Sequence, residues 1–90
     1  IETDYLYGGY NLPSEEVRNA IYDMARSEAI VLDPCYTGKA YAALLDMIKQ
    51  EKIRKGETII FIHTGGFPGV YTPAHRKAFE AELMDGITIL

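Results

Sequence analysis

Apolar residues recur at helical spacing in three stretches of the chain. The first stretch opens after Ser14, a residue type suited to the N-cap, and two glutamates follow in the first turn, where the helix dipole favours negative charge. A broader apolar face predicts a second helix over residues 38–50. Thr72 and Pro73 mark the start of a third helix, which we expect to run to residue 84. The apolar stripe of the first helix consists of Val17, Ala20, Ile21, Met24 and Ala25.

Two short apolar runs lie between these helices. Residues 29–32 and 59–62 are continuous and rich in β-branched side chains, which is typical of strands buried on both faces of a parallel sheet. Strands that alternate with helices predict an α/β fold built on one right-handed βαβ unit. Residues 87–90 are a further candidate strand, and we expect residues 1–90 to form a single unit.

Each predicted strand runs into a polar turn, Asp33–Lys39 after the first and His63–Gly69 after the second. Ligands of open α/β sheets lie outside the carboxyl ends of the strands, so we expect the two turns to face one crevice. Thr37 is also placed to cap the second helix, whose N-terminus with Lys39 would attract an anion. The hydroxyl groups expected to converge in this crevice belong to Tyr10, Tyr36, Thr37 and Thr64.

Charge and composition narrow the possible classes of protein. Nine basic residues against 13 acidic ones give a net charge of −4, and the basic residues are scattered, which argues against nucleic-acid binding. No apolar run approaches the ~20 residues that span a bilayer, so we expect no membrane association. A single cysteine, Cys35, excludes an internal disulfide and fits a reducing, cytoplasmic compartment.

The residue types that remain favour cofactor chemistry over metal or nucleophilic chemistry. We expect no metal site, because no metal-ligand motif and no pair of cysteines occurs. His63 ends a predicted strand, which favours a hydrogen-bonded structural role, and His75 lies in a first helical turn, where we expect solvent. Tyrosine and threonine hydroxyls suit a site that holds a polar heteroaromatic cofactor and moves protons.

Three motifs in a fixed order resemble a known family. The loop around Gly9 and Tyr10, the sequence Asp33–Ala40 (DPCYTGKA) and the sequence Phe61–Gly66 (FIHTGG) resemble the C-terminal part of the D-cysteine desulfhydrase and 1-aminocyclopropane-1-carboxylate deaminase family. The resemblance leaves residues 73–90 as a helical tail outside the motifs. It implies pyridoxal 5′-phosphate as cofactor, an amino-acid substrate, a homodimer in the complete enzyme and a partial parallel sheet flanked by helices, part of a tryptophan-synthase β-like fold.

The resemblance also implies roles for individual residues. Tyr36 and Tyr10 would be catalytic, in proton transfer or in positioning the substrate, while Thr64 and Gly65 would contact the cofactor near its pyridine nitrogen. Thr37, also cofactor-binding, stands where the deaminase branch has an acid. A neutral threonine stabilises a pyridinium charge less than a carboxylate does. This weaker electron sink favours α,β-elimination of D-cysteine or a related amino acid to pyruvate, ammonia and sulfide. The deaminase branch is the alternative.

Parts of the family's site are not in this sequence. The Schiff-base lysine, a substrate-binding serine and a phosphate-cradling loop lie N-terminal to the matching region, and Lys39 stands in a different context. We therefore expect a C-terminal portion of a lyase that has the missing N-terminal part as its partner and does not hold the cofactor stably alone. Two other interpretations stay open: a small module whose glycine turns bind a phosphate or nucleotide, and a non-catalytic fragment that folds or dimerises through residues 38–50.

Overall fold

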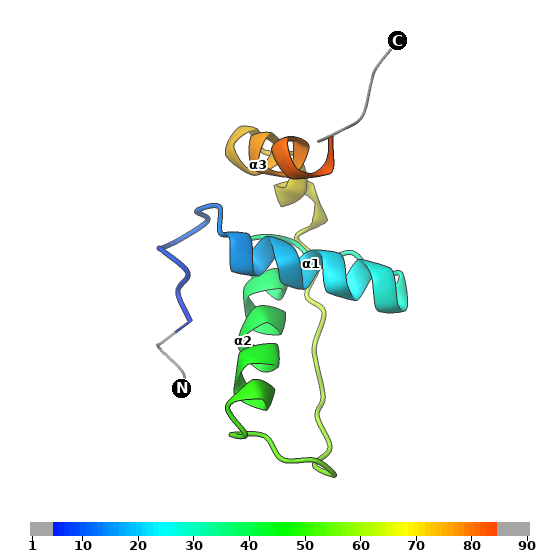
Figure 1. Ribbon diagram of the computed structural model, residues 1–90. Coiled ribbons are helices and arrows are strands. Elements are labelled where there is room, and N and C mark those ends of the chain that lie inside the picture. Colours follow the sequence, from blue (N-terminus) through cyan, green and yellow to red (C-terminus); the bar gives the residue numbers. More distant parts are fainter. Residues whose placement is uncertain (1–4, 85–90) are drawn as a thin grey trace.

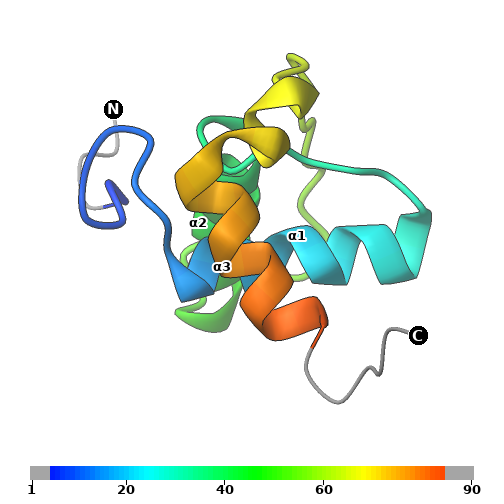
Figure 2. The same cartoon turned by 90° about the horizontal axis from the view of Figure 1, so that it is seen from above.

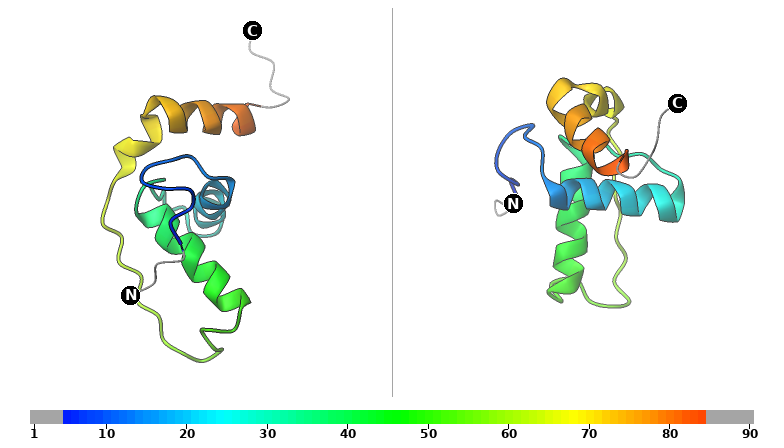
Figure 3. Two further views of the ribbon diagram at one scale, coloured as in Figure 1. Left: turned by 90° about the vertical axis from the view of Figure 1, so that its left-hand side faces the viewer. Right: turned by 45° about the horizontal axis from the view of Figure 1, so that its top comes forward.

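The computed structural model describes residues 5–84, in which three α-helices and one short 3₁₀ helix follow one another (Figure 1). Seen from above, α3 crosses over α1 (Figure 2), and side views place α1 between α3 and the length of α2 (Figure 3). The three helices predicted from the sequence are therefore confirmed. The α-helices are α1 (Glu15–Glu28), α2 (Thr37–Lys49) and α3 (Pro73–Leu83), and the 3₁₀ helix η1 is Phe67–Tyr71.

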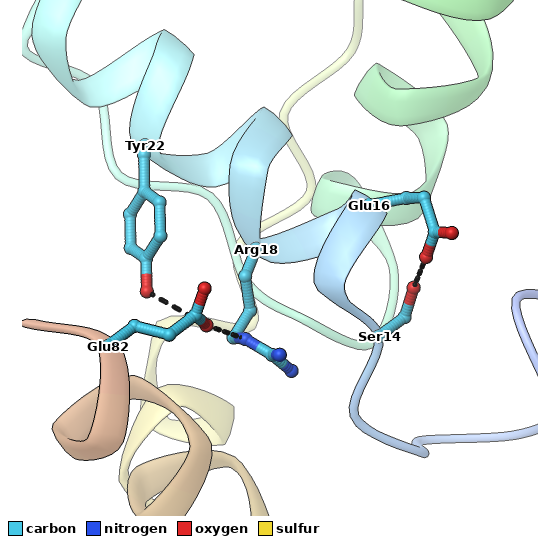
Figure 4. A network of polar contacts seen from close by, with 5 residues as sticks. All are labelled: Ser14, Glu16, Arg18, Tyr22 and Glu82. Atoms are coloured by element: carbon cyan, nitrogen blue, oxygen red, sulfur yellow. Dashed lines mark hydrogen bonds and ion pairs between the residues drawn. The ribbon is translucent and has the colours of Figure 1, made fainter.

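A small apolar core lies where the three helices meet. Tyr22 of α1 packs edge-on against Phe79 of α3, with 5.9 Å between the ring centroids. Beside this contact Arg18 forms an ion pair with Glu82, and the Tyr22 hydroxyl donates to the same carboxylate at 3.4 Å (Figure 4). These contacts fix α3 on α1. The buried core consists of Val17, Ala20, Ile21, Leu32, Ala42 and Phe79.

The predicted sheet is absent from the described part of the chain, so the α/β assignment is wrong for this structure. Residues 29–32 and 59–62 are irregular, and among the described residues no backbone hydrogen bond joins them. Ile60, expected to be buried, is 84% exposed. The two runs still approach each other, because His63 Nε2 lies 3.0 Å from the Val31 carbonyl oxygen. β-Branched runs form strands only where neighbouring backbone supplies a ladder, and a pair of strands alone is marginal.

One further prediction about the fold fails together with the sheet, and two others are not tested by the described residues. The βαβ unit, and with it the partial parallel sheet flanked by helices, is not present between residues 5 and 84. The candidate strand at 87–90 lies outside the described residues. The grouping of residues 1–90 into one unit stays a prediction. No helix within the described range has the length and apolar character needed to span a membrane.

Gly38 lets the start of α2 approach both α1 and the preceding turn. A Cβ atom at this position would lie 2.4 Å from the Asp33 carbonyl oxygen, 3.0 Å from Val17 Cγ1 and 3.1 Å from Ile21 Cγ1. The nearest of these atoms belongs to the backbone, which cannot rotate away as a side chain can. The absence of a side chain at Gly38 is therefore a packing requirement of the α1–α2 contact.

We expect Gly38→Ala to lower the free energy of unfolding by about 2 kcal/mol. Overpacking costs ~1–3 kcal/mol, while alanine returns ~1 kcal/mol of helix propensity at most. Urea unfolding followed by circular dichroism measures the change. Gly69→Ala is the matched control, because the nearest atom to its added Cβ is Pro34 Cδ at 3.8 Å. Equal stability of the two variants would contradict the close packing at Gly38.

Candidate functional site

The turn before α2 is built around the carboxylate of Asp33, a residue only 1% exposed. Its oxygens accept hydrogen bonds from the backbone N–H groups of Cys35 at 2.8 Å, Tyr36 at 2.7 Å and Thr37 at 2.8 Å. A helix leaves its first N–H groups without intrahelical partners, and here Asp33 satisfies them. The prediction that Thr37 caps α2 is therefore wrong: Thr37 is the first helical residue, and Asp33 supplies the capping oxygens.

Thr37 is buried at 2% exposure, and its hydroxyl is committed to Asp33. The hydroxyl accepts from the Asp33 N–H at 2.8 Å and donates its proton to Asp33 Oδ1 at 2.5 Å. One lone pair remains, so toward a ligand Thr37 Oγ1 can only accept. Burial tends to raise the pKa of Asp33, but the hydrogen bonds from the Thr37 hydroxyl and from the three amides outweigh it and hold that pKa below its usual value.

This arrangement disfavours the phosphate- or nucleotide-binding module at the start of α2. Helix N-termini attract anions through unpaired amides and a positive dipole end. Here an ionised carboxylate already occupies the amides, and an incoming phosphate would meet its charge. Lys39, the other group expected to attract an anion, donates from Nζ to the Gly9 carbonyl oxygen at 2.6 Å.

Tyr10 and Tyr36, the two predicted catalytic residues, lie together on the surface. Their hydroxyl oxygens are 3.2 Å apart and their rings meet edge-on, with 6.4 Å between the centroids. Tyr10 is 76% exposed and Tyr36 59%, so a ligand can reach both. The hydrogen bond to Tyr10 raises the pKa of Tyr36 to about 12. Tyr36 therefore keeps its proton at neutral pH.

The second turn, His63–Gly66, packs directly on the first. His63 Nε2 donates to the Val31 carbonyl oxygen at 3.0 Å and Nδ1 accepts the Gly65 N–H at 3.0 Å, which confirms a structural role for this histidine. Gly66 has φ +86°, and a Cβ there would lie 2.6 Å from Asp33 Cγ. The two turns thus meet where Gly66 lies against the Asp33 carboxylate, although the predicted strands that were to bring them to one crevice are absent from the described residues.

Thr64 and Gly65 lie on the open side of the second turn. Thr64 is exposed, and among the described residues no hydrogen bond joins it to either tyrosine. Gly65 has φ +95°, and no described atom lies within 4 Å of where its Cβ would be. The structure therefore brings Tyr10 to Tyr36 and the two turns to each other, and it leaves the backbone at Gly65 open to a ligand.

His75 was expected in solvent, but it is 1% exposed. Its Nε2 lies 3.0 Å from the Asn11 carbonyl oxygen and 2.9 Å from Asn11 Oδ1. α3 packs on α1 through Phe79, and the local pattern around His75 does not reveal this docking or the contact with Asn11.

Three hollows of the described surface are lined by residues other than Tyr10 and Tyr36. One of about 520 Å³ lies between Tyr5, Tyr7 and the facing sides of α1 and α2. Within residues 5–84 no three histidine, cysteine or acidic side chains gather to hold a metal ion. Tyr10, Tyr36 and Thr64 are exposed on the surface of the described chain.

Comparison with known proteins places the chain beside one family and beside many individual proteins, of which one is described here. Residues 1–65 match the family described as pyridoxal-phosphate dependent enzyme. The chain is 52% identical over 68 residues to the D-cysteine desulfhydrase of Yersinia enterocolitica, a match that covers 76% of this chain and 21% of that protein. The chain thus spans about a fifth of the length of this relative.

Proposed function

This chain belongs to the pyridoxal-phosphate dependent enzyme family, and from that premise we propose that it is the C-terminal part of a lyase acting on D-cysteine. The reaction is α,β-elimination, in which D-cysteine and water give pyruvate, ammonia and hydrogen sulfide. The observation that carries the proposal is the hydrogen-bonded pair of exposed tyrosines, Tyr10 and Tyr36, beside two glycine turns. The name of the 52% identical relative supports the choice of substrate.

The residues present fit one wall of a pyridoxal-phosphate site. A planar heteroaromatic ring needs open backbone to lie against and polar groups at its edge. Gly65 offers the open backbone and Thr64 an exposed hydroxyl. Thr37 is 2% exposed in this chain and bonded to Asp33, and one lone pair of its oxygen remains to accept from a ring N–H. We propose that these three residues contact the cofactor. The lysine and the phosphate loop would come from an N-terminal part of the fold, and the complete enzyme would be a cytoplasmic homodimer.

Pyridoxal phosphate supplies the electron sink that elimination from an amino acid requires. The tyrosine pair handles the proton on the leaving group. When the C–S bond breaks, the sulfur keeps the electron pair and takes the proton of Tyr36 Oη. Tyr36, with a pKa of about 12, carries that proton at neutral pH. Tyr10, at 3.2 Å, then passes a proton to Tyr36 and, being 76% exposed, takes a proton back from solvent water.

Elimination is preferred over opening of the 1-aminocyclopropane-1-carboxylate ring because of Thr37. Its hydroxyl is neutral and its only proton points to Asp33, so it offers a ring nitrogen one lone pair and no formal charge. A weaker electron sink suffices when a leaving group departs promptly, as sulfur does. Ring opening has no such leaving group.

A hybrid enzyme tests the proposal. Residues 1–65 of this chain replace the aligned segment of the Yersinia enterocolitica enzyme, and release of hydrogen sulfide and pyruvate from D-cysteine is measured. We expect kcat/KM within about tenfold of the parent enzyme, a difference of ~1.4 kcal/mol in transition-state stabilisation.

Absorbance of bound cofactor and thermal unfolding show whether the hybrid is assembled. An assembled hybrid that opens 1-aminocyclopropane-1-carboxylate and releases no sulfide would replace the proposed reaction with the deaminase reaction. An assembled hybrid with neither activity would leave the chain with a non-catalytic role.

A further inference from the structure

Tyr10 lies between two residues whose carbonyl groups are held from different helices. Lys39 of α2 donates to the carbonyl oxygen of Gly9 at 2.6 Å. His75 of α3 lies 3.0 Å from the carbonyl oxygen of Asn11. The loop is thus fixed immediately before and immediately after Tyr10. Asn11 itself has φ +55°, a left-handed conformation that needs support from its surroundings.

The chemistry of the partners sets the proton position on His75. Both atoms near Nε2 are oxygens of Asn11, and a carbonyl oxygen can only accept, so Nε2 carries the hydrogen. Nδ1 is buried and has no hydrogen-bond partner among the described residues. The ring therefore contributes one directed donor from a buried position, and that donor is aimed at the Tyr10 loop.

α3 is anchored independently of this hydrogen bond. Phe79 is buried in the core against Tyr22, and Glu82 pairs with Arg18 of α1 (Figure 4). A ring held on such a helix acts as a fixed point for the loop rather than following its motion. α3 also lies beyond residues 1–65, the segment that matches the family, so the match assigns it no role.

We propose that His75 is a positioning residue: from α3 it fixes the loop at Asn11 so that the Tyr10 hydroxyl meets Tyr36. The proposal depends on the proposed function only in that the proposed function gives the tyrosine pair its catalytic use. The contact that it explains, 3.2 Å between the two hydroxyl oxygens, is a property of the chain itself.

Nitration by tetranitromethane at pH 8 tests this in the 90-residue chain without cofactor. The reagent attacks phenolate, and Tyr36 is exposed but ionises little, because its contact with Tyr10 raises its pKa to about 12. Loss of that contact removes the main cause of the raised pKa, so the phenolate fraction of Tyr36 at pH 8 rises. In His75→Leu, which keeps the bulk and removes the donor, we expect nitration of Tyr36 to become at least ~10-fold faster. His75→Gln, which retains an N–H donor, should restore the slow rate.

Peptide mapping of the same samples measures the nitration rate of Tyr41. This rate should not change, because the Tyr41 hydroxyl bonds Asp23. An unchanged Tyr36 rate in a folded His75→Leu chain would overturn the proposal. If that variant does not fold, proton exchange in the unaltered chain decides: slow exchange of the His75 Nε2–H supports the proposal and rapid exchange overturns it. The hybrid enzyme contains the relative's own segment after residue 65, so its activity succeeds or fails independently of His75.

Discussion

Replacing Asp33 with alanine is expected to unfold the start of α2 and most of the α1–α2 contact with it. Three backbone N–H groups and the Thr37 hydroxyl lose their acceptor. Two of these donors are buried and two are partly buried. A buried donor left without a partner costs ~1–3 kcal/mol, so the sum is about 4 kcal/mol. Total stability of a 90-residue chain is ~5–13 kcal/mol, so the loss is a large part of it. Helical circular dichroism and the urea midpoint measure the effect.

Asp33→Asn is the matched control. The amide has the same shape and keeps one acceptor oxygen, so we expect it to retain the helix with about half the loss of stability, ~2 kcal/mol. Equal stability of Asp33→Ala and the unaltered chain would show that the turn does not depend on the carboxylate.

The same carboxylate makes stability depend on pH in a known direction. Burial is outweighed by hydrogen bonds, so the folded-state pKa of Asp33 lies below its unfolded value of ~3.9. Such a group stabilises the fold fully above the unfolded pKa, and this contribution is lost as pH falls through the folded pKa. We therefore expect the urea concentration at the unfolding midpoint to fall as the pH is lowered below about 4. In Asp33→Asn this fall should be less steep.

Tyr36→Phe in the hybrid enzyme is expected to lower kcat for D-cysteine by about 100-fold, with a smaller change in KM. Removing a positioned proton donor costs ~10²–10⁴-fold, and Tyr10 remains nearby as a partial substitute. The loss should be less than about tenfold with β-chloro-D-alanine, because chloride departs without a proton. Steady-state rates of pyruvate release from both substrates measure the difference.

Tyr41→Phe is the control for this substitution. It removes a phenol hydroxyl from α2, the helix that follows Tyr36, and that hydroxyl bonds Asp23 rather than either tyrosine of the pair. Its kcat should match the parent hybrid. Equal losses with cysteine and with the chloride substrate in Tyr36→Phe would assign Tyr36 to positioning and remove it from proton transfer.

The sequence pattern was sufficient for the helices and for the family. Period and end signals located all three α-helices, because an α-helix satisfies its hydrogen bonds within one stretch of chain. The strands at 29–32 and 59–62 were predicted wrongly, because a strand depends on a neighbouring backbone that no local pattern reports. The resemblance of the three motifs to a pyridoxal-phosphate family is confirmed by the match over residues 1–65.

The candidate site was also predictable only in part, because local sequence signals do not report contacts between distant parts of the chain. The motifs singled out Tyr10 and Tyr36, which the structure brings together; their catalytic roles and the cofactor contacts of Thr37, Thr64 and Gly65 stay predictions. Asp33 was missed as a capping residue, although an aspartate before a proline and a helix start is a recognisable signal. His75 was misplaced because its burial depends on a contact with Asn11, 64 positions away in the chain.

Sequence separation also orders the events by which the tyrosine pair is completed. α1 and α2 are neighbours in the chain and can associate as soon as residue 49 has been synthesised. The contacts of Arg18 with Glu82 and of Asn11 with His75 each bridge 64 positions, so they close last. Tyr10 would therefore reach its final orientation only after the helical pair has assembled.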